Sequence, residues 1–219
     1  MSATPRLARL AQRGATAREA RQEHCDMCGA PVAPEHRHLL DLRERRVMCA
    51  CRACAILFDR HAASDGHYRL IPDRRLRLAD LELSDLMWEE LRLPVELAFF
   101  FRSAADERVL AFYPSPMGPT ESLLDLDAWA ALEADNPVLA GLEPDVEALL
   151  VNRARGARGY WIVPIDECYT LVGLIRTRWR GLTGGREVWD EIGRFFERLD
   201  GRSRPASRND EKETTTWRG

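Results

Sequence analysis

Two Cys-x-x-Cys pairs near the N-terminus constrain the structure of this sequence more than any other feature. Cys25 and Cys28 form the first pair, and Cys51 and Cys54 form the second. A Cys-x-x-Cys turn presents two sulfurs from one tight knuckle, and two such knuckles supply the four tetrahedral ligands of a structural zinc ion. Gly29, directly after the first pair, permits the positive φ that such knuckles often require. The four cysteines therefore predict one structural zinc site.

The sequence leaves the ligand set and the metal partly open. Cys49 lies two residues before Cys51, so both side chains point to the same face of an extended strand and Cys49 is an alternative ligand. His24, His36 and His38 also fall in this region, but four cysteines already complete a closed site, which favours exposed or hydrogen-bonded histidines. A site of four thiolates also binds iron, as in rubredoxin. Zinc is the favoured ion because the second pair lacks the glycine expected for the iron site.

Composition indicates a globular chain. Hydrophobic residues make up 45% and charged residues 31% of the 219 residues. The longest apolar run, Leu93–Phe101, is interrupted by Pro94 and Glu96 and is too short to span a bilayer. The first residues lack the apolar region of a secretory signal, and metal-bound thiolates explain paired cysteines in a reducing compartment better than disulfides do. We therefore expect a cytoplasmic protein without a membrane span.

The chain is expected to have an α+β fold in four segments. A flexible basic arm at 1–23 precedes a zinc-ribbon module at 24–60, an α+β domain at 73–200 and a disordered polar tail at 201–219. In the module, HRHLLDL and VMCAC predict two strands joined by a turn. This β-hairpin is expected to carry both Cys-x-x-Cys knuckles.

The first half of the α+β domain is predicted to contain a short helix and a hairpin. Residues 73–97 form a connector and a helix-like stretch with Ser84 as N-cap, ended by Pro94. The runs at 95–103 and 108–115 are rich in β-forming residues and predict an antiparallel hairpin.

The middle of the domain combines a loop with short helices. Residues 114–122 contain three prolines and a glycine and predict a turn-rich loop. The sequence does not decide whether this loop has a function beyond turning the chain. A helix is expected from Asp125 or Asp127 through Ala134, and a second short helix from Pro144.

Two amphipathic helices are predicted at the C-terminus. A strand at 160–163 stops at Pro164, and Asp166 is expected to cap a helix that Gly184-Gly185 ends. One apolar face of this helix holds Cys168, Val172, Ile175, Trp179 and Leu182. The last helix runs to Asp200 and is expected to bury Val188, Trp189, Ile192, Phe195, Phe196 and Leu199.

Charge is unevenly distributed along the chain. Residues 109–152 contain eight acids and no Lys, Arg or His, whereas residues 153–186 contain seven arginines against Asp166 and Glu167. We expect these blocks to neutralise each other within the fold, and the alternative is an acidic docking face. The net charge of −3 and the acidic middle make nucleic-acid binding an unfavoured interpretation.

The remaining reactive side chains make weak catalytic candidates. Cys168 lies on an apolar helical face, which favours a buried thiol over a nucleophile. Asp145 with Glu147, or Asp166 with Glu167, could form an acid and base pair, but nothing in the sequence fixes their geometry, and capping or solvated faces are the favoured explanation.

Several longer segments together resemble an uncharacterised actinobacterial family. They are CDMCGAPVAPEHRHLLDL, CACRACAILF, AFYPSPMGPTES, PDVEALLVNR, VPIDECYTLVGLIRTRWRGLTGG and VWDEIGRFF, and they cover roughly Glu23–Leu199. The family's genes tend to lie in clusters for uptake nickel–iron hydrogenases. The resemblance implies a role in hydrogenase assembly or maturation, with hydrogenase subunits or maturation factors as partners, and implies no catalytic residues.

The favoured hypothesis is a non-enzymatic, zinc-binding accessory protein. A rubredoxin-like iron electron carrier and an enzyme of unknown type are the alternatives.

Overall fold

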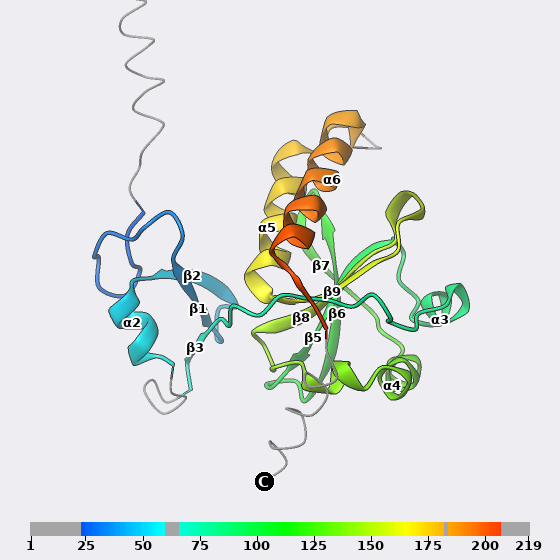
Figure 1. The fold of residues 1–219 in the computed structure, drawn as a ribbon, viewed down its shortest axis with the longest axis horizontal. Helices are drawn as coiled ribbons and strands as arrows, with labels where there is room; N and C mark the ends of the chain where they lie inside the picture. Colours follow the sequence, from blue (N-terminus) through cyan, green and yellow to red (C-terminus); the bar gives the residue numbers. More distant parts are fainter. Residues whose placement is uncertain (1–22, 60–65, 182–183, 207–219) are drawn as a thin grey trace, which may run out of the picture. The chain divides into compact units, whose positions relative to one another are not determined.

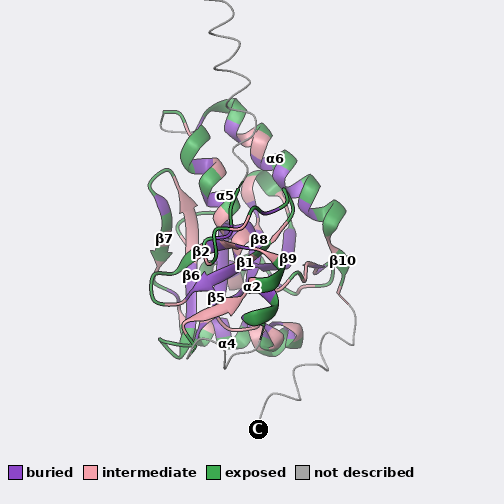
Figure 2. Ribbon diagram, turned by 90° about the vertical axis from the view of Figure 1, so that its left-hand side faces the viewer, coloured by how far each residue is buried: buried purple, intermediate pink, exposed green. Residues whose placement is uncertain are grey.

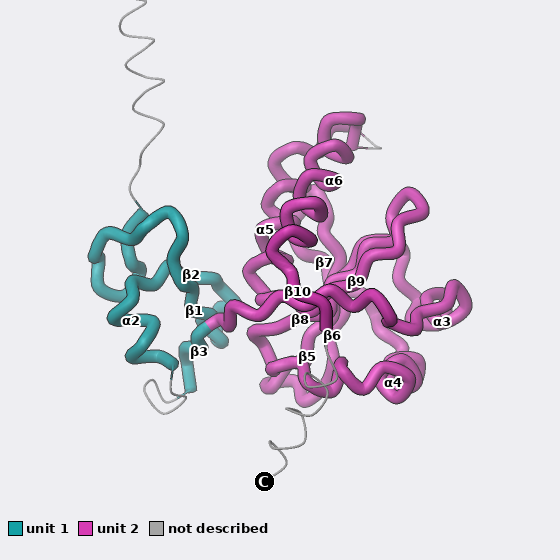
Figure 3. Tube along the Cα trace, viewed as in Figure 1, with its two compact units in different colours: residues 1–70 teal, residues 71–219 magenta. Residues whose placement is uncertain are grey.

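The computed structural model describes residues 23–59, 66–181 and 184–206. Figure 1 shows the helices and strands along the chain, and Figure 3 colours its two compact units, residues 1–70 and 71–219. Of the basic arm expected at 1–23, all but Glu23 lies outside the described residues. The expected tail lies outside them from residue 207 onward.

The first unit is built on a three-stranded antiparallel sheet in the order β2-β1-β3, with the short helix α2 beside it. Asp41 turns the chain between β1 and β2, because its Oδ1 accepts hydrogen bonds from the backbone N–H groups of Arg43 and Glu44. The two strands expected between the cysteine pairs are therefore present. The elements are β1 (Arg37–Asp41), β2 (Arg46–Ala50), α2 (Arg52–Leu57) and β3 (Tyr68–Leu70).

The core of this unit lies on one face of the β1–β2 hairpin. Leu39 and its cross-strand partner Met48 point to that face, and Ala55 and Phe58 pack against them from α2 and its end. Because β3 pairs with β1, the unit continues to Leu70, beyond the 24–60 module expected from the sequence.

The second unit contains a seven-stranded sheet in the order β10-β4-β9-β8-β5-β6-β7. Its pairings are antiparallel except for β10 with β4, which is parallel. The strands are β4 (Leu76–Arg77), β5 (Leu97–Ser103), β6 (Arg108–Ser115), β7 (Gly118–Ser122), β8 (Glu147–Asn152), β9 (Gly159–Pro164) and β10 (Arg204–Pro205).

Helices cover both faces of this sheet, which explains why its central strands β5, β8 and β9 are buried over most of their length (Figure 1). On β5, Phe100 contacts Trp129 of α4, whereas Phe99 on the other face contacts Tyr169 of α5. Figure 2 shows the buried strands enclosed by helices with exposed outer faces. The helices are α3 (Asp85–Glu90), α4 (Leu126–Asp135), α5 (Ile165–Arg178), α6 (Gly185–Arg202) and the 3₁₀ helices η2 (Pro137–Gly141) and η3 (Ala154–Gly156).

Several predicted elements of the second unit are confirmed. Ser84 caps α3 by accepting a hydrogen bond from the N–H of Met87, and this helix ends before Pro94. The predicted hairpin is β5 with β6, and Asp125 caps α4. The strand expected at 160–163 is β9, and α6 buries its apolar face as predicted, with Trp189 only partly buried.

The prediction of a turn-rich loop at 114–122 is wrong, because most of this segment is strand. β6 continues to Ser115 and β7 begins at Gly118. Pro114 and Pro119 face each other across the β6–β7 pair. β7 is the last strand of the sheet, where the missing N–H of a proline is tolerated.

Three helix boundaries differ from those expected. Pro144 lies in a turn before β8 instead of starting a helix, because pairing with two neighbouring strands outweighs local helix propensity. Pro164 precedes α5 and Asp166 lies in its first turn, so Asp166 is not the N-cap. Helix α5 ends at Arg178, and Gly184 is the N-cap of α6 with φ of 83°.

The tail predicted to be disordered from residue 201 is ordered as far as residue 206. Helix α6 continues to Arg202, and β10 then pairs with β4. The N–H groups of Arg204 and Ala206 donate to the carbonyls of Arg75 and Arg77 at 3.1 and 3.0 Å. Two-residue pairing of this kind has no sequence pattern long enough to predict it.

The acidic block at 109–152 is neutralised in part within the fold, by arginines outside the predicted 153–186 block. Four of its carboxylates pair with arginines that precede it in the sequence. The pairs are Glu121 with Arg108, Asp125 with Arg92, Glu133 with Arg102 and Glu147 with Arg74.

In the described ranges, no helix combines the length and hydrophobicity required to cross a membrane.

Candidate metal centre

The first cysteine pair lies in a tight backbone turn. The N–H of Gly29 donates to the carbonyl of Cys25, and the N–H of Cys25 donates to the carbonyl of Ala30, both at 2.8 Å. Gly29 has φ of 72°, in the left-handed region that favours glycine, as expected from the sequence. The turn therefore has the knuckle conformation predicted for Cys25 and Cys28.

The second cysteine pair opens a helix instead of forming a second knuckle on the hairpin. Cys51 is the N-cap of α2 with extended φ and ψ of −70° and 164°, and Cys54 lies in the first turn. The segment Arg52–Leu57 (RACAIL) favours helix because Arg, Ala and Leu are strong helix formers, and Ala55 packs into the core. The predicted arrangement of two knuckles on one hairpin is therefore replaced by a knuckle, a hairpin and a helix.

These elements bring four sulfurs together. The Sγ atoms of Cys25, Cys28, Cys51 and Cys54 all lie within 4.8 Å of one another, and those of Cys28 and Cys51 are 3.6 Å apart. Four sulfurs around one zinc ion at ~2.3 Å lie about 3.8 Å from each other in a tetrahedron. The cluster therefore has the dimensions required to hold one metal ion.

Hydrogen bonds fasten the knuckle to the hairpin. The N–H of Asp26 donates to the carbonyl of Cys49 at 2.9 Å, and Asp26 Oδ2 accepts from the N–H of Cys49 at 2.6 Å. Both bonds join the residue after Cys25 to the end of β2. They position the first cysteine pair against the start of α2.

The thiol pKa values reflect burial, backbone amides and the crowding of sulfurs. Burial raises the pKa of Cys25, but backbone N–H groups of Cys51, Cys28 and Met27 outweigh it and lower this pKa to about 6. Burial and the neighbouring sulfurs raise the pKa of Cys54 to about 12. The cluster therefore combines one readily ionised thiol with one that loses its proton with difficulty, and a cation that replaces the proton favours all the thiolates.

Cys49 is not part of the four-sulfur cluster, although it lies only two residues before Cys51. It groups instead with His36 and His38, and the ligand atoms of these three residues also lie within 4.8 Å of one another. The sequence identifies all three as possible ligands of the first ion but does not show that they form a group of their own. Only the strand register shows it, because His38 faces Cys49 across the hairpin.

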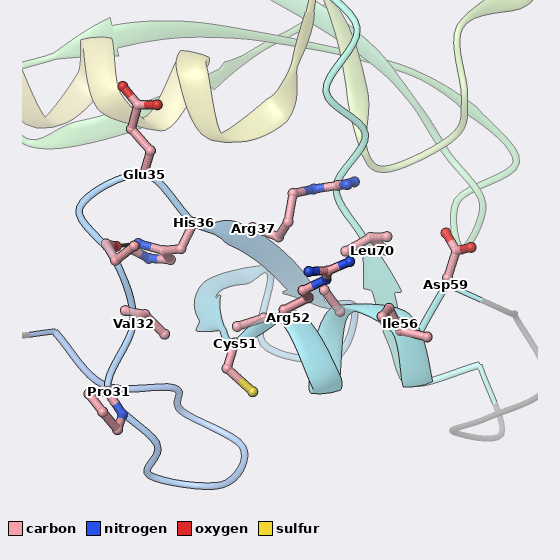
Figure 4. A pocket seen from close by; sticks show the side chains of 13 residues that line it. Pro31, Val32, Glu35, His36, Arg37, Cys51, Arg52, Ile56, Asp59 and Leu70 are labelled. Atoms are coloured by element: carbon pink, nitrogen blue, oxygen red, sulfur yellow. Dashed lines mark hydrogen bonds between the residues drawn. The ribbon is translucent and has the colours of Figure 1, made fainter.

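A hollow of about 600 Å³ lies beside the four-sulfur cluster in the first unit (Figure 4). Its apolar lining includes Val32, Ile56 and Leu70. Charged residues of both signs also line it, namely Arg37, Arg52, Glu35 and Asp59. Cys51 forms part of its wall, so the start of α2 borders both the hollow and the four-sulfur cluster.

In the second unit, burial and ion pairing account for three of the residues considered as catalytic candidates, Cys168, Glu147 and Glu167. Burial, followed by the neighbouring carboxylates, raises the pKa of Cys168 well above its ordinary value, so this thiol is a poor nucleophile. Glu147 accepts two hydrogen bonds from the guanidinium of Arg74 at 2.8 and 2.5 Å. Glu167 accepts one from Arg75 at 2.8 Å. Ion pairing accounts for these buried carboxylates.

The fold and the site define a two-unit α+β protein with a cluster of four cysteines that can hold a metal ion. A family model matches residues 24–203, and the chain therefore belongs to this family of unknown function, DUF5947. The match spans both units. Neither the curated proteins nor the solved structures contain a match to the chain.

Proposed function

We propose that the chain is a zinc-binding accessory protein without catalytic activity. Its first unit holds one structural zinc ion through Cys25, Cys28, Cys51 and Cys54, and its second unit binds a protein partner. The observation that carries this proposal is the convergence of the four sulfurs within 4.8 Å. Four thiolates close the coordination sphere and leave no position for substrate or water, which supports a structural role for the ion.

Zinc is favoured over iron by the form of the second cysteine pair. A rubredoxin-like site would be expected to use two glycine-containing knuckles, whereas here Cys51 and Cys54 open α2 and Ala55 follows them. An iron electron carrier is the alternative function.

The metal is tested by zinc analysis of purified protein after dialysis against dilute chelator. One zinc ion per chain is expected to remain, because a closed site of four thiolates binds tightly and contributes to folding. Cys51→Ser should lose this ion, whereas Cys49→Ser and Cys168→Ser should keep it. The opposite result for Cys49 and Cys51 would reassign the ligands. A coloured protein that contains iron would contradict the zinc proposal and support the alternative function, an iron electron carrier.

Exposed apolar side chains at both ends of β7 support a partner-binding role for the second unit. Met117, just before this strand, is 91% exposed, and Leu123, just after it, is 85% exposed. Among the described residues, β7 is also an outermost strand with one backbone edge that pairs with no other strand. A partner that covers this strand would bury both side chains.

The partner we propose is a nickel–iron hydrogenase subunit or maturation factor, on the basis of the family resemblance. Affinity capture from the native host, followed by mass spectrometry, tests it. Met117→Ser with Leu123→Ser should abolish capture of such a protein, whereas Leu86→Ser, which changes an exposed leucine of α3, should not. Capture without any hydrogenase component would reject this partner and leave the zinc site unaffected.

A further inference from the structure

We propose that the first unit carries a second metal site, formed by His36, His38 and Cys49. The site binds a zinc-like divalent transition-metal ion through two imidazole nitrogens and one thiolate. Its fourth coordination position is open to water or to a ligand from outside the chain. It shares no residue with the four-sulfur cluster.

The β1–β2 hairpin places His38 and Cys49 on one face, and His36, directly before β1, lies with them. His38 and Cys49 are direct cross-strand partners, and His36 precedes His38 by two residues. Leu39 and Met48, the adjacent cross-strand pair, point the opposite way into the core of the unit. The three polar side chains are therefore grouped on the face of the hairpin that does not carry this core.

The distances suit a single ion. One ligand atom from each of the three residues lies within 4.8 Å of the others, and the two imidazole rings have their centroids 4.7 Å apart. Ligand atoms at the corners of a zinc tetrahedron lie roughly 3.3–3.8 Å apart. Movements of about 1 Å or less, within the reach of side-chain rotation, bring all three atoms onto one ion.

His36 is prepared as a ligand by its surroundings. Its Nδ1 lies 2.8 Å from the carbonyl oxygen of Ala33, and a carbonyl only accepts, so Nδ1 carries the proton. The lone pair of the neutral ring is therefore on Nε2. This nitrogen is buried and has no hydrogen-bond partner in the part of the chain that the structure describes, and the side chain is only 8% exposed. A ring N–H held by a backbone carbonyl is the usual outer contact of a metal-bound histidine.

Nearby carboxylates make the position favourable for a cation. An oxygen of Glu23 lies 3.8 Å from His36 Nδ1, and Asp26 Oδ2 accepts the backbone N–H of Cys49 at 2.6 Å. Neither carboxylate contacts the atoms proposed to bind the ion, because Glu23 lies near Nδ1 of His36 and Asp26 contacts the backbone of Cys49. A divalent ion at the site would be attracted by these charges.

The two sites differ in character, although Cys49 and Cys51 are separated only by Ala50. The four-sulfur site is closed, whereas the second has three protein ligands and a free position. We therefore expect the second ion to bind more weakly and to exchange more readily. The free position is the place where an external ligand, such as a side chain of a partner, would reach the ion.

Cobalt(II) titration of the untagged full-length protein tests the proposal, starting from protein that already holds its tightly bound zinc. Cobalt should produce visible absorption that saturates at one further equivalent per chain. X-ray absorption at the cobalt edge should show one sulfur among nitrogen and oxygen neighbours. Absence of saturable binding, or a shell of four sulfurs around cobalt, would overturn the second site.

Variants assign the ligands. His36→Ala, His38→Gln and Cys49→Ser should each weaken cobalt binding at least tenfold while the first zinc ion is retained, which also shows that the unit is folded. His67→Ala is the matched control and should bind cobalt as the wild type does, because His67 contacts Arg43 at 2.7 Å instead of the cluster. Undiminished binding by all three ligand variants would contradict the proposal. Retained zinc is measured separately, so failure of one site is distinguishable from failure of the other.

Discussion

Cys49 and Cys51 show how a single residue separates two environments. Strand alternation alone would direct both side chains to one face, but β2 ends at Ala50 and Cys51 already has the extended N-cap conformation that leads into α2. The change of backbone direction takes Cys51 to the four-sulfur cluster and leaves Cys49 facing His38.

The affinity of the four-sulfur site for zinc should depend on pH, because zinc competes with protons for thiolates. The pKa of Cys25 is lowered to about 6, so near neutral pH this residue would bind zinc without releasing a proton. The pKa of Cys54 is raised to about 12, so Cys54 must release one. Affinity should therefore rise with pH, and below about pH 6 it should fall more steeply as Cys25 is also protonated.

Competition with a chelator of known affinity, repeated over a pH series, measures this dependence. Proton release on zinc addition in weakly buffered solution gives the number of protons displaced. Affinity that is constant from about pH 6 to about pH 9 would contradict the assignment of thiols that must ionise on binding.

Buried and exposed ion pairs of the second unit should differ sharply in their contribution to stability. The side chain of Glu147 is 2% exposed and forms an ion pair with Arg74, whose side chain is 22% exposed, so Glu147→Gln removes the buried negative charge of this pair. We expect a loss of about 3 kcal/mol in the free energy of unfolding, measured by urea denaturation. Glu121→Gln removes the exposed pair with Arg108 and should cost less than about 1 kcal/mol. Equal effects would show that burial does not govern these pairs.

At the scale of elements, β10 is a short strand with a measurable role. Two backbone hydrogen bonds join it to the segment around β4, and Ala206 packs against the core. The free energy of unfolding of a chain that ends at Arg202 should therefore be about 1–3 kcal/mol lower than that of a chain that ends at Ala206, since each bond contributes roughly 0.5–1.5 kcal/mol. Paired urea titrations measure the difference, and indistinguishable curves would show that β10 does not stabilise the sheet.

Elements with a local signal are predictable from this sequence, and those defined by distant pairing are not. The β5–β6 hairpin follows from two adjacent β-rich runs and a short link. In contrast, β7 contains a proline, and β10 has only two residues, so their strand conformation depends on the neighbours they pair with. β8 is also absent from the prediction, because its EALL segment has residues that form helices as well as strands.

The same distinction applies to the candidate site. Cys-x-x-Cys spacing suffices to group Cys25, Cys28, Cys51 and Cys54, because each pair is local and two such pairs are the usual ligand set of one shared ion. The grouping of His38 with Cys49 depends on the register of β1 with β2, and a slip of one residue would place them on opposite faces. Register follows from the turn at Asp41 and from the buried Leu39–Met48 pair, so it becomes known only with the structure.

At the scale of the whole molecule, the two units should differ in how they depend on metal. The main core of the second unit is formed entirely by residues from Leu76 onward, and the seven-stranded sheet is also contained within this unit. The core of the first unit contains only a few large side chains, so the binding energy of an ion held by its four cysteines would be a major part of its stability.

A fragment that spans residues 71–206 should therefore fold cooperatively without metal. Calorimetry of the full chain should resolve two transitions, and strong chelator should remove the transition of the first unit and leave the other in place. The fragment should melt within a few degrees of that remaining transition, because its main core and its seven-stranded sheet are formed by its own residues. A fragment without a cooperative transition, or a chelator effect that abolishes both transitions together, would show that the first unit is required for the second to fold.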